Sequence, residues 1–200
     1  LLISQEVKEA NRTDYWKFNQ KHAPYLFFMG VGEYEVIEDS YKNIPVNYYV
    51  EKKYASLARE IFGLTPEMIG FFETKLGVNY PWNKYSQIVA REYVSGAMEN
   101  TTAVIHGESA YQMKGQLIDE NRQENTIAHE VFHHWFGNLV TTESWSNLAL
   151  NESFANYSQY LWREYKYGKT DADAHLFENT KPYLSDPSNH EKKLVRYYYL

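Results

Sequence analysis

The sequence predicts an α+β fold, because segments with strand-like alternation come first and segments with helical spacing dominate later. Between residues 25 and 54, apolar residues alternate or form short blocks that glycine, aspartate and asparagine interrupt. After residue 110 the apolar residues recur at helical spacing, so we expect this part to be mostly helical. A chain of 200 residues, 44% of them hydrophobic, can fill one core or one domain with part of another.

Each element has its own local signals. The expected strands are YLFFMGVG, YEVI and IPVNYYV between residues 25 and 50, then YSQIVAREYV at 85–94 and TTAVI at 101–105. The expected helices are KKYASLAREIFG, TPEMIGFFETKLG, residues 120–136 and residues 148–167. A glycine closes each helix, and a Thr-Pro pair opens the second. The change from strand to helix spacing places a boundary at residue 45, between a first unit at 1–45 and a second at 46–200.

Composition narrows the class of protein. Lys and Arg number 20 against 26 Asp and Glu, and no basic run could follow a phosphate backbone, so we expect no nucleic-acid partner. The apolar stretches are too short to span a bilayer, and we expect a soluble chain without a membrane segment. With no cysteine, any metal must be held by His, Asp or Glu. Because the chain starts at Leu1 and stops within an aromatic run, we expect a fragment of a longer protein.

The segment HEVFHHWFGN, which begins at His129, carries a metal-ligand pattern on a predicted helix. His129 and His133 lie one turn apart, so both imidazoles can reach one ion. Glu130 lies about 100° around the helix, too far to be a ligand but near enough to act as a base on water. Such a three-position motif arises by chance in roughly one chain in forty of this length, so it needs a third ligand for support.

Glu152, in NESFA, is the candidate third ligand, and it lies far enough beyond His133 for a second helix to run back beside the first. On that helix an apolar stripe is expected to face the core, with Glu152 on the opposite side; the stripe consists of Leu150, Phe154, Tyr157, Leu161 and Tyr165. An ordinary solvent-facing glutamate would also lie opposite the core. His134 cannot share the ligand face, and we expect it to support the ligands from outside or to pack in the core.

Three segments together resemble one family: GAMEN at 96–100, HEVFHHWFGNLVT at 129–141 and LNESFA at 150–155. Their order and separations resemble the aminopeptidase N family of zinc metallopeptidases, over roughly residues 45–167. The resemblance implies a thermolysin-like catalytic domain at 46–200, preceded by the C-terminal strands of an N-terminal β domain at 1–45. Departures such as His134 and Ser153, where the family often has Gln and Gly, remove no ligand and no base.

The resemblance also implies roles for individual residues. His129, His133 and Glu152 would hold one Zn²⁺ per chain, and Glu130 would be the general base. The GAMEN segment would bind the substrate, with Glu99 pairing with its α-ammonium group and Gly96 letting the strand approach the peptide backbone. The contacting residues are Gly96, Ala97, Met98, Glu99 and Asn100. The family's oxyanion-stabilising tyrosine would lie beyond Leu200, since Tyr197 to Tyr199 come too early, and a second contact to the amine would lie before Leu1.

The expected function is therefore a zinc-dependent aminopeptidase that removes N-terminal residues from peptides with a free amino terminus, through a zinc-activated water and Glu130. Because groups outside the chain are needed, we expect the 200 residues alone to be poorly active. One alternative is a thermolysin-like endopeptidase, which would accept a blocked amino terminus. The other is a non-catalytic peptide-binding module on the same fold, which the intact HExxH motif disfavours.

Overall fold

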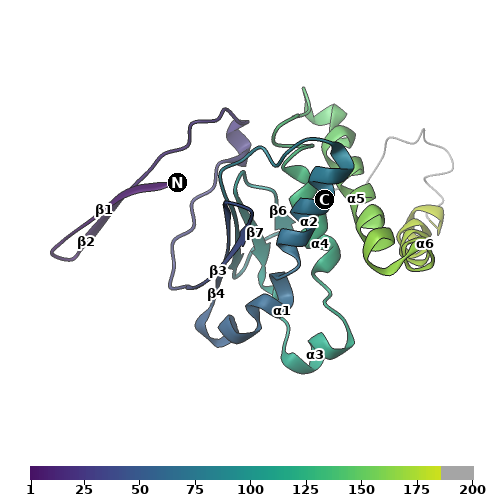
Figure 1. The fold of residues 1–200 in the computed structure, drawn as a ribbon, viewed down its shortest axis with the longest axis horizontal. Coiled ribbons are helices and arrows are strands. Elements are labelled where there is room, and N and C mark those ends of the chain that lie inside the picture. The colour runs from purple at the N-terminus through teal and green to yellow at the C-terminus, as the bar shows by residue number, and fades with distance from the viewer. Residues whose placement is uncertain (186–200) are drawn as a thin grey trace.

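The computed structural model describes residues 1–185, which form a mixed α/β domain and a projecting N-terminal hairpin (Figure 1). The strands are β1 (Leu2–Lys8), β2 (Asn11–Trp16), β3 (Glu35–Tyr41), β4 (Ile44–Val50), β5 (Tyr85–Ala90), β6 (Ala97–Met98) and β7 (Ala103–Gly107). The α-helices are α1 (Ala58–Phe62), α2 (Thr65–Leu76), α3 (Lys114–Asp119), α4 (Glu124–His133), α5 (Ala149–Tyr167) and α6 (Lys169–Ser185). The short 3-10 helices are η1 (Pro24–Leu26), η2 (Lys52–Leu57), η3 (Glu108–Ala110) and η4 (Trp145–Asn147).

The main sheet has five strands in the order β3-β4-β5-β7-β6. β4 pairs in parallel with β5, and β5 with β7. The helices η2, α1 and α2 form the crossover from β4 to β5, whereas the connection from β5 to β7 contains the edge strand β6. β3 and β6 are the antiparallel strands at the two edges. β4 buries alternate residues, Val46, Tyr48 and Val50, as a strand with one face on a core requires. The edge strand β6 lies within the GAMEN segment, so this segment has one side free of strand partners.

The helices pack on the sheet and then on one another. α2 and α4 pack together beside the sheet, α5 packs on α4, and α6 packs on α5 (Figure 1). α2 begins with a Thr-Pro pair and ends at Gly77, whose φ of 66° is the left-handed conformation that a helix end favours, as predicted. One side of α4 packs in the core, where the residues of the helix and the tryptophan that follows it are buried: Ala128, Val131, Phe132 and Trp135.

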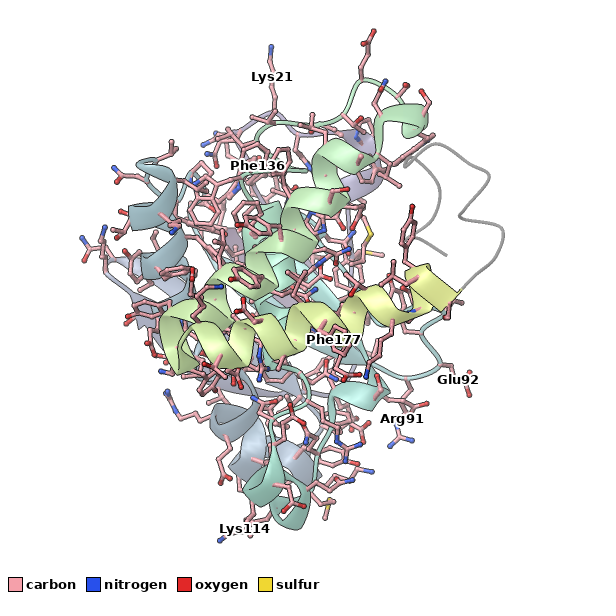
Figure 2. The ribbon with its side chains drawn as sticks, turned by 90° about the vertical axis from the view of Figure 1, so that its right-hand side faces the viewer. Lys21, Arg91, Glu92, Lys114, Phe136 and Phe177 are labelled. Carbon is pink, nitrogen blue, oxygen red and sulfur yellow. The ribbon has the colours of Figure 1, made fainter. Side chains whose placement is uncertain are left out.

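The predicted core stripe of α5 is wrong. The residues that α5 buries are Asn151, Ala155, Ser158 and Trp162, whereas Phe154, Tyr157 and Tyr165 are about half exposed. Small side chains let α5 approach α4 closely, and Ser158 Oγ lies 3.4 Å from the carbonyl oxygen of Ala128. Figure 2 shows Phe136 beside the upper part of α5, where its ring contacts Phe154 at 4.9 Å between centroids. Helical spacing located this helix correctly. It also identified the apolar side, but that side is not the one that packs in the core.

The predicted strand YLFFMGVG is also wrong. It forms η1 and then an irregular segment in which Phe27, Met29 and Val31 are more than 70% exposed. Leu26, by contrast, is buried, and its carbonyl oxygen accepts hydrogen bonds from the backbone N–H of Thr101 and the side-chain amide of Asn100. The backbone of this segment thus hydrogen-bonds to a turn and not to a neighbouring strand. The alternation of apolar residues cannot distinguish these two kinds of pairing.

Several other boundaries differ from the sequence predictions. β5 ends at Ala90, and α4 covers Glu124–His133, so both are shorter than expected. Strands were expected within residues 1–45, but the hairpin β1–β2 was not located individually, and the helices α3 and α6 were not predicted. α6 starts directly after Gly168 and lies across α5 in Figure 2. Within residues 1–185, each helix is too short or too polar to cross a lipid bilayer.

Candidate metal centre

Helix α4 brings two imidazole nitrogens to one point. His129 and His133 are one turn apart, and their Nε2 atoms lie 2.9 Å from each other. His133 is buried, and the His129 side chain is 13% exposed, so one edge of the pair is open to solvent. The outer nitrogen of His133, Nδ1, contacts the carbonyl oxygen of Phe136 at 2.9 Å. This contact makes Nδ1 the N–H donor, so Nε2 is the nitrogen that could bind a metal when the imidazole is neutral.

Helix α5 supplies a carboxylate to the same point. Glu152 Oε2 lies 3.2 Å from His129 Nε2 and 3.4 Å from His133 Nε2. Glu152 is therefore not a solvent-facing glutamate, as its side chain is 12% exposed. The reason is the small-residue face of α5, which packs on α4 and carries Glu152 one residue away from the buried Asn151.

These three side chains fit a zinc ion. A tetrahedral zinc with bonds of 2.0 to 2.1 Å holds its ligand atoms about 3.3 Å apart, and the three observed separations are 2.9, 3.2 and 3.4 Å. Two imidazoles and one carboxylate form a typical catalytic zinc set, which leaves a fourth position open. The ligand atoms of His129, His133 and Glu152 all lie within 4.8 Å of one another, as a common ion requires.

The charges in the site favour a cation. Burial acts to raise the pKa of Glu152, but the hydrogen bonds with His129 and His133 outweigh it and lower that pKa to about 2. Burial acts to lower the pKa of His133, yet its hydrogen bond with Glu152 and the charges of three nearby glutamates raise it to about 9. Burial lowers the pKa of His129. Three carboxyl groups thus lie around two imidazoles, and a divalent ion bound among them would stabilise the ionised forms of these carboxyl groups.

Glu130 lies beside the ligands without joining them. Its side chain is buried, and Oε2 has no hydrogen-bond partner within residues 1–185. Burial raises its pKa well above the ordinary value for a glutamate. A carboxylate with a raised pKa and an oxygen free of hydrogen bonds is suited to accept a proton from a nearby water molecule.

The GAMEN segment places a second carboxyl group on the same side. Glu99, directly after β6, is 5% exposed, and its carboxylate lies within 4.8 Å of ligand atoms of Glu130 and His133. Burial is the main cause that raises the pKa of Glu99. Ala97 and Met98 are half-buried and pair with β7, and an added side chain on Gly96 would meet open space. The segment therefore joins Glu99 to the metal-ligand cluster and leaves the edge of β6 accessible.

Sequence reasoning missed Gln159, whose side-chain amide lies 3.3 Å from His129 Nδ1. The contacting atom is the amide nitrogen, Nε2. When His129 Nε2 binds a metal, Nδ1 carries the hydrogen, and a rotation of the Gln159 amide by about 180° would then present its oxygen to this N–H group. Gln159 follows Glu152 by two helical turns, so it lies on the same face of α5. The seven-residue spacing between Glu152 and Gln159 could have indicated from the sequence that Gln159 lies on the ligand side of α5.

Replacing Gln159 with alanine should weaken zinc affinity by about 10- to 100-fold, because the hydrogen-bond partner that orients His129 is lost. The control is Gln159→Glu, which keeps an acceptor for the Nδ1 hydrogen and should keep affinity within a few-fold. Competition with a zinc-binding dye measures both variants. Equal affinity of Gln159→Ala and the unmodified protein would exclude this role.

The fold and the site define the class: a mixed α/β domain in which two packed helices carry side chains that could hold a metal ion. The peptidase family M1 domain matches residues 61–197. The chain is 32% identical over 167 residues to aminopeptidase N of Streptomyces lividans, covering 79% of this chain and 20% of that protein. It is 31% identical over 175 residues to mitochondrial aminopeptidase 2 of Saccharomyces cerevisiae, covering 82% and 18%.

Glutamyl aminopeptidase of Bos taurus is 32% identical over 163 residues, covering 77% of this chain and 17% of that protein. The chain belongs to peptidase family M1, the aminopeptidase N family of zinc metallopeptidases. It spans about a fifth of the length of these relatives.

Proposed function

We propose that the chain carries the zinc site and the amine-binding segment of an aminopeptidase that removes N-terminal residues from peptides. The observation that carries this proposal is the convergence of two sets of groups. His129, His133 and Glu152 present three ligand atoms to one point, and Glu99 and Glu130 lie within reach of the same point. The three relatives described above are named aminopeptidase N, aminopeptidase 2 and glutamyl aminopeptidase, which supports the same activity.

The proposed mechanism assigns a separate task to each side chain. Zinc held by His129, His133 and Glu152 would supply Lewis acidity, which polarises a carbonyl oxygen and makes a water molecule acidic near neutral pH. Glu130 accepts the proton of the attacking water at Oε2, its free carboxylate oxygen, and then transfers it to the leaving amine. Burial raises the pKa of Glu130, so this carboxylate binds a proton more strongly than an exposed glutamate does, as a proton acceptor requires.

Glu99 accounts for the exopeptidase character. The α-ammonium group of a substrate can pair with this buried carboxylate, and the substrate backbone can extend the sheet along the free edge of β6. Only the first peptide bond then reaches the metal centre, because Glu99 lies within 4.8 Å of His133 and Glu130. The pairing would also favour the ionised form of Glu99, whose pKa burial raises.

We further propose a thermolysin-like catalytic domain at 46–200 that follows a β domain ending near residue 45. The five-stranded sheet contains strands from both sides of that position, so the two units would share one sheet at their junction. The tyrosines at 197–199, which the sequence disfavours as oxyanion donors, lie outside the described residues.

Replacing Glu99 with alanine tests the proposal against a thermolysin-like endopeptidase. Loss of a charge-assisted pair worth roughly 1.5 to 3 kcal/mol should lower kcat/KM for free-amine peptides by about 10- to 100-fold. N-acetylated peptides should be affected far less, so the preference for a free amino terminus should narrow. A matched control is Glu108→Ala, which removes an exposed glutamate of η3.

Cleavage assays on paired free and acetylated peptides measure this preference. If the protein is an endopeptidase, its unmodified form will cleave both the free and the acetylated peptide. Glu99→Ala will then change the cleavage rate of neither peptide. These assays use the full-length protein that contains this chain, and a non-catalytic module would cleave neither peptide even when it is loaded with zinc. Either result would overturn the aminopeptidase proposal.

A further inference from the structure

The turn that follows Glu99 has an unusual backbone. Residues 100–103 form a tight turn in which the Ala103 N–H donates to the Asn100 carbonyl oxygen at 2.9 Å. The third residue, Thr102, has a φ of 66°, in the left-handed region that a β-branched residue rarely adopts. Such strain persists only where neighbouring groups hold the backbone, and it is frequent at functional sites. The question is which groups hold this turn.

His134 holds one end of the turn. Its imidazole is fully buried between Tyr80 and Tyr85, with ring centroids 5.7 and 4.8 Å away. Nδ1 contacts the Glu130 carbonyl oxygen at 3.0 Å, and Nε2 contacts the Thr102 backbone nitrogen at 3.2 Å. A backbone N–H can only donate, so Nε2 is the acceptor and the hydrogen must lie on Nδ1. His134 is therefore a neutral link between the metal-binding helix and the turn.

Asn138 holds the other end. Its side-chain amide nitrogen donates to the carbonyl oxygen of Glu99 at 2.9 Å, and the side chain is buried. On the opposite side of the turn, the Leu26 carbonyl oxygen accepts the N–H of Thr101 at 3.2 Å and the amide of Asn100 at 3.4 Å. The backbone of residues 99–102 is thus held both from the segment after the zinc ligands and from the loop at Leu26.

We propose that His134 and Asn138 are positioning residues that set the location of the Glu99 carboxylate relative to the metal ligands. This inference rests on the proposed function, in which Glu99 binds the substrate amine. His134 follows the ligand His133 directly, and Asn138 follows it by five residues. The short segment from His133 to Asn138 would therefore bind the metal through His133. It would also position the amine-binding Glu99 through His134 and Asn138. A displacement of about 1 Å in such an arrangement can cost about 100-fold in rate, although neither residue touches the substrate.

Two substitutions at position 134 separate positioning from packing. In His134→Asn, the amide can take the place of Nδ1 and keep the contact with Glu130, but nothing reaches Thr102. In His134→Gln, the amide oxygen can take the place of Nε2 and accept the Thr102 N–H. We expect His134→Asn to lose about 10- to 100-fold in the ratio of kcat/KM between free-amine and N-acetylated peptides, with zinc content unchanged. His134→Gln should keep that ratio within about three-fold of the unmodified protein.

A purely structural histidine would give a different pattern. An unchanged preference in both variants, or an equal loss in both, would overturn the inference. Asn138→Ala provides a second route if His134→Asn fails to fold, because it breaks the contact with Glu99 and leaves His134 in place. It should reduce the preference with zinc retained, and an unchanged preference would contradict the role of the pair. Equal cleavage of both peptides by the unmodified protein would instead contradict the proposed function itself.

Discussion

Replacing Glu130 with glutamine should lower kcat by about 10²- to 10⁴-fold while the protein keeps its zinc. The amide has the shape of the carboxyl group but cannot accept a proton, so the attacking water loses its base. Zinc should be retained because Glu130 is outside the ligand set of His129, His133 and Glu152, whose atoms lie 2.9 to 3.4 Å apart. Removing one buried charge beside His133 should leave the fold intact, since Oε2 makes no hydrogen bond within residues 1–185.

The matched control is Glu120→Gln, an exposed glutamate just before α4 that should leave turnover unchanged. Steady-state kinetics on a free-amine peptide, together with metal analysis of the same samples, gives both quantities. Retained turnover would remove Glu130 from the role of base. Loss of zinc would show instead that Glu130 belongs to the ligand set.

Replacing Glu152 with alanine should lower zinc affinity by more than about 100-fold, a larger loss than removal of a hydrogen-bond partner of a ligand produces. Within residues 1–185, Glu152 Oε2 is the one carboxylate oxygen that lies within 3.4 Å of both imidazole Nε2 atoms. Without it, two neutral imidazoles would remain, and a zinc site with two protein ligands is weak. Activity should fall together with zinc content, and excess zinc should restore part of it.

The same change should lower the pKa of His133 in the metal-free protein. Burial alone lowers this pKa, and the hydrogen bond with Glu152 is the main cause that raises it to about 9. Nuclear magnetic resonance titration of the imidazole checks the direction of the shift. The control is Glu164→Ala, on the same helix but away from the ligands, which should change neither zinc affinity nor this pKa. Unchanged zinc affinity in Glu152→Ala would contradict the ligand assignment.

The metal-binding pattern was predictable because it depends on spacing along one helix. His129 and His133 lie four residues apart, and a helix places them on one side whatever surrounds it. Helix ends were predictable for the same reason, as at Gly77, where a left-handed residue closes α2. In both cases the information is local, so neighbouring residues suffice to determine the structure.

The faces of α5 were not predictable from spacing. Its aromatic stripe is the most apolar side, yet the side that packs on α4 carries Asn151, Ala155 and Ser158. Close approach of two helices favours small residues, whereas a hydrophobic pattern identifies large ones. The predicted strand YLFFMGVG failed for a related reason, since the carbonyl oxygen of Leu26 binds a turn from a distant segment. The roles proposed for His134, Asn138 and Gln159 also depend on contacts between distant segments. The sequence alone therefore did not predict these roles.

The most direct test of the account is a crystal of the zinc-loaded protein measured with X-rays at the zinc absorption edge. The account predicts one strong anomalous peak, about 2.0 to 2.2 Å from His129 Nε2, His133 Nε2 and a carboxylate oxygen of Glu152. A peak among Glu99, Glu130 and His133, the other group of side chains within residues 1–185 whose geometry could hold an ion, would contradict it. So would the absence of any peak near these two helices.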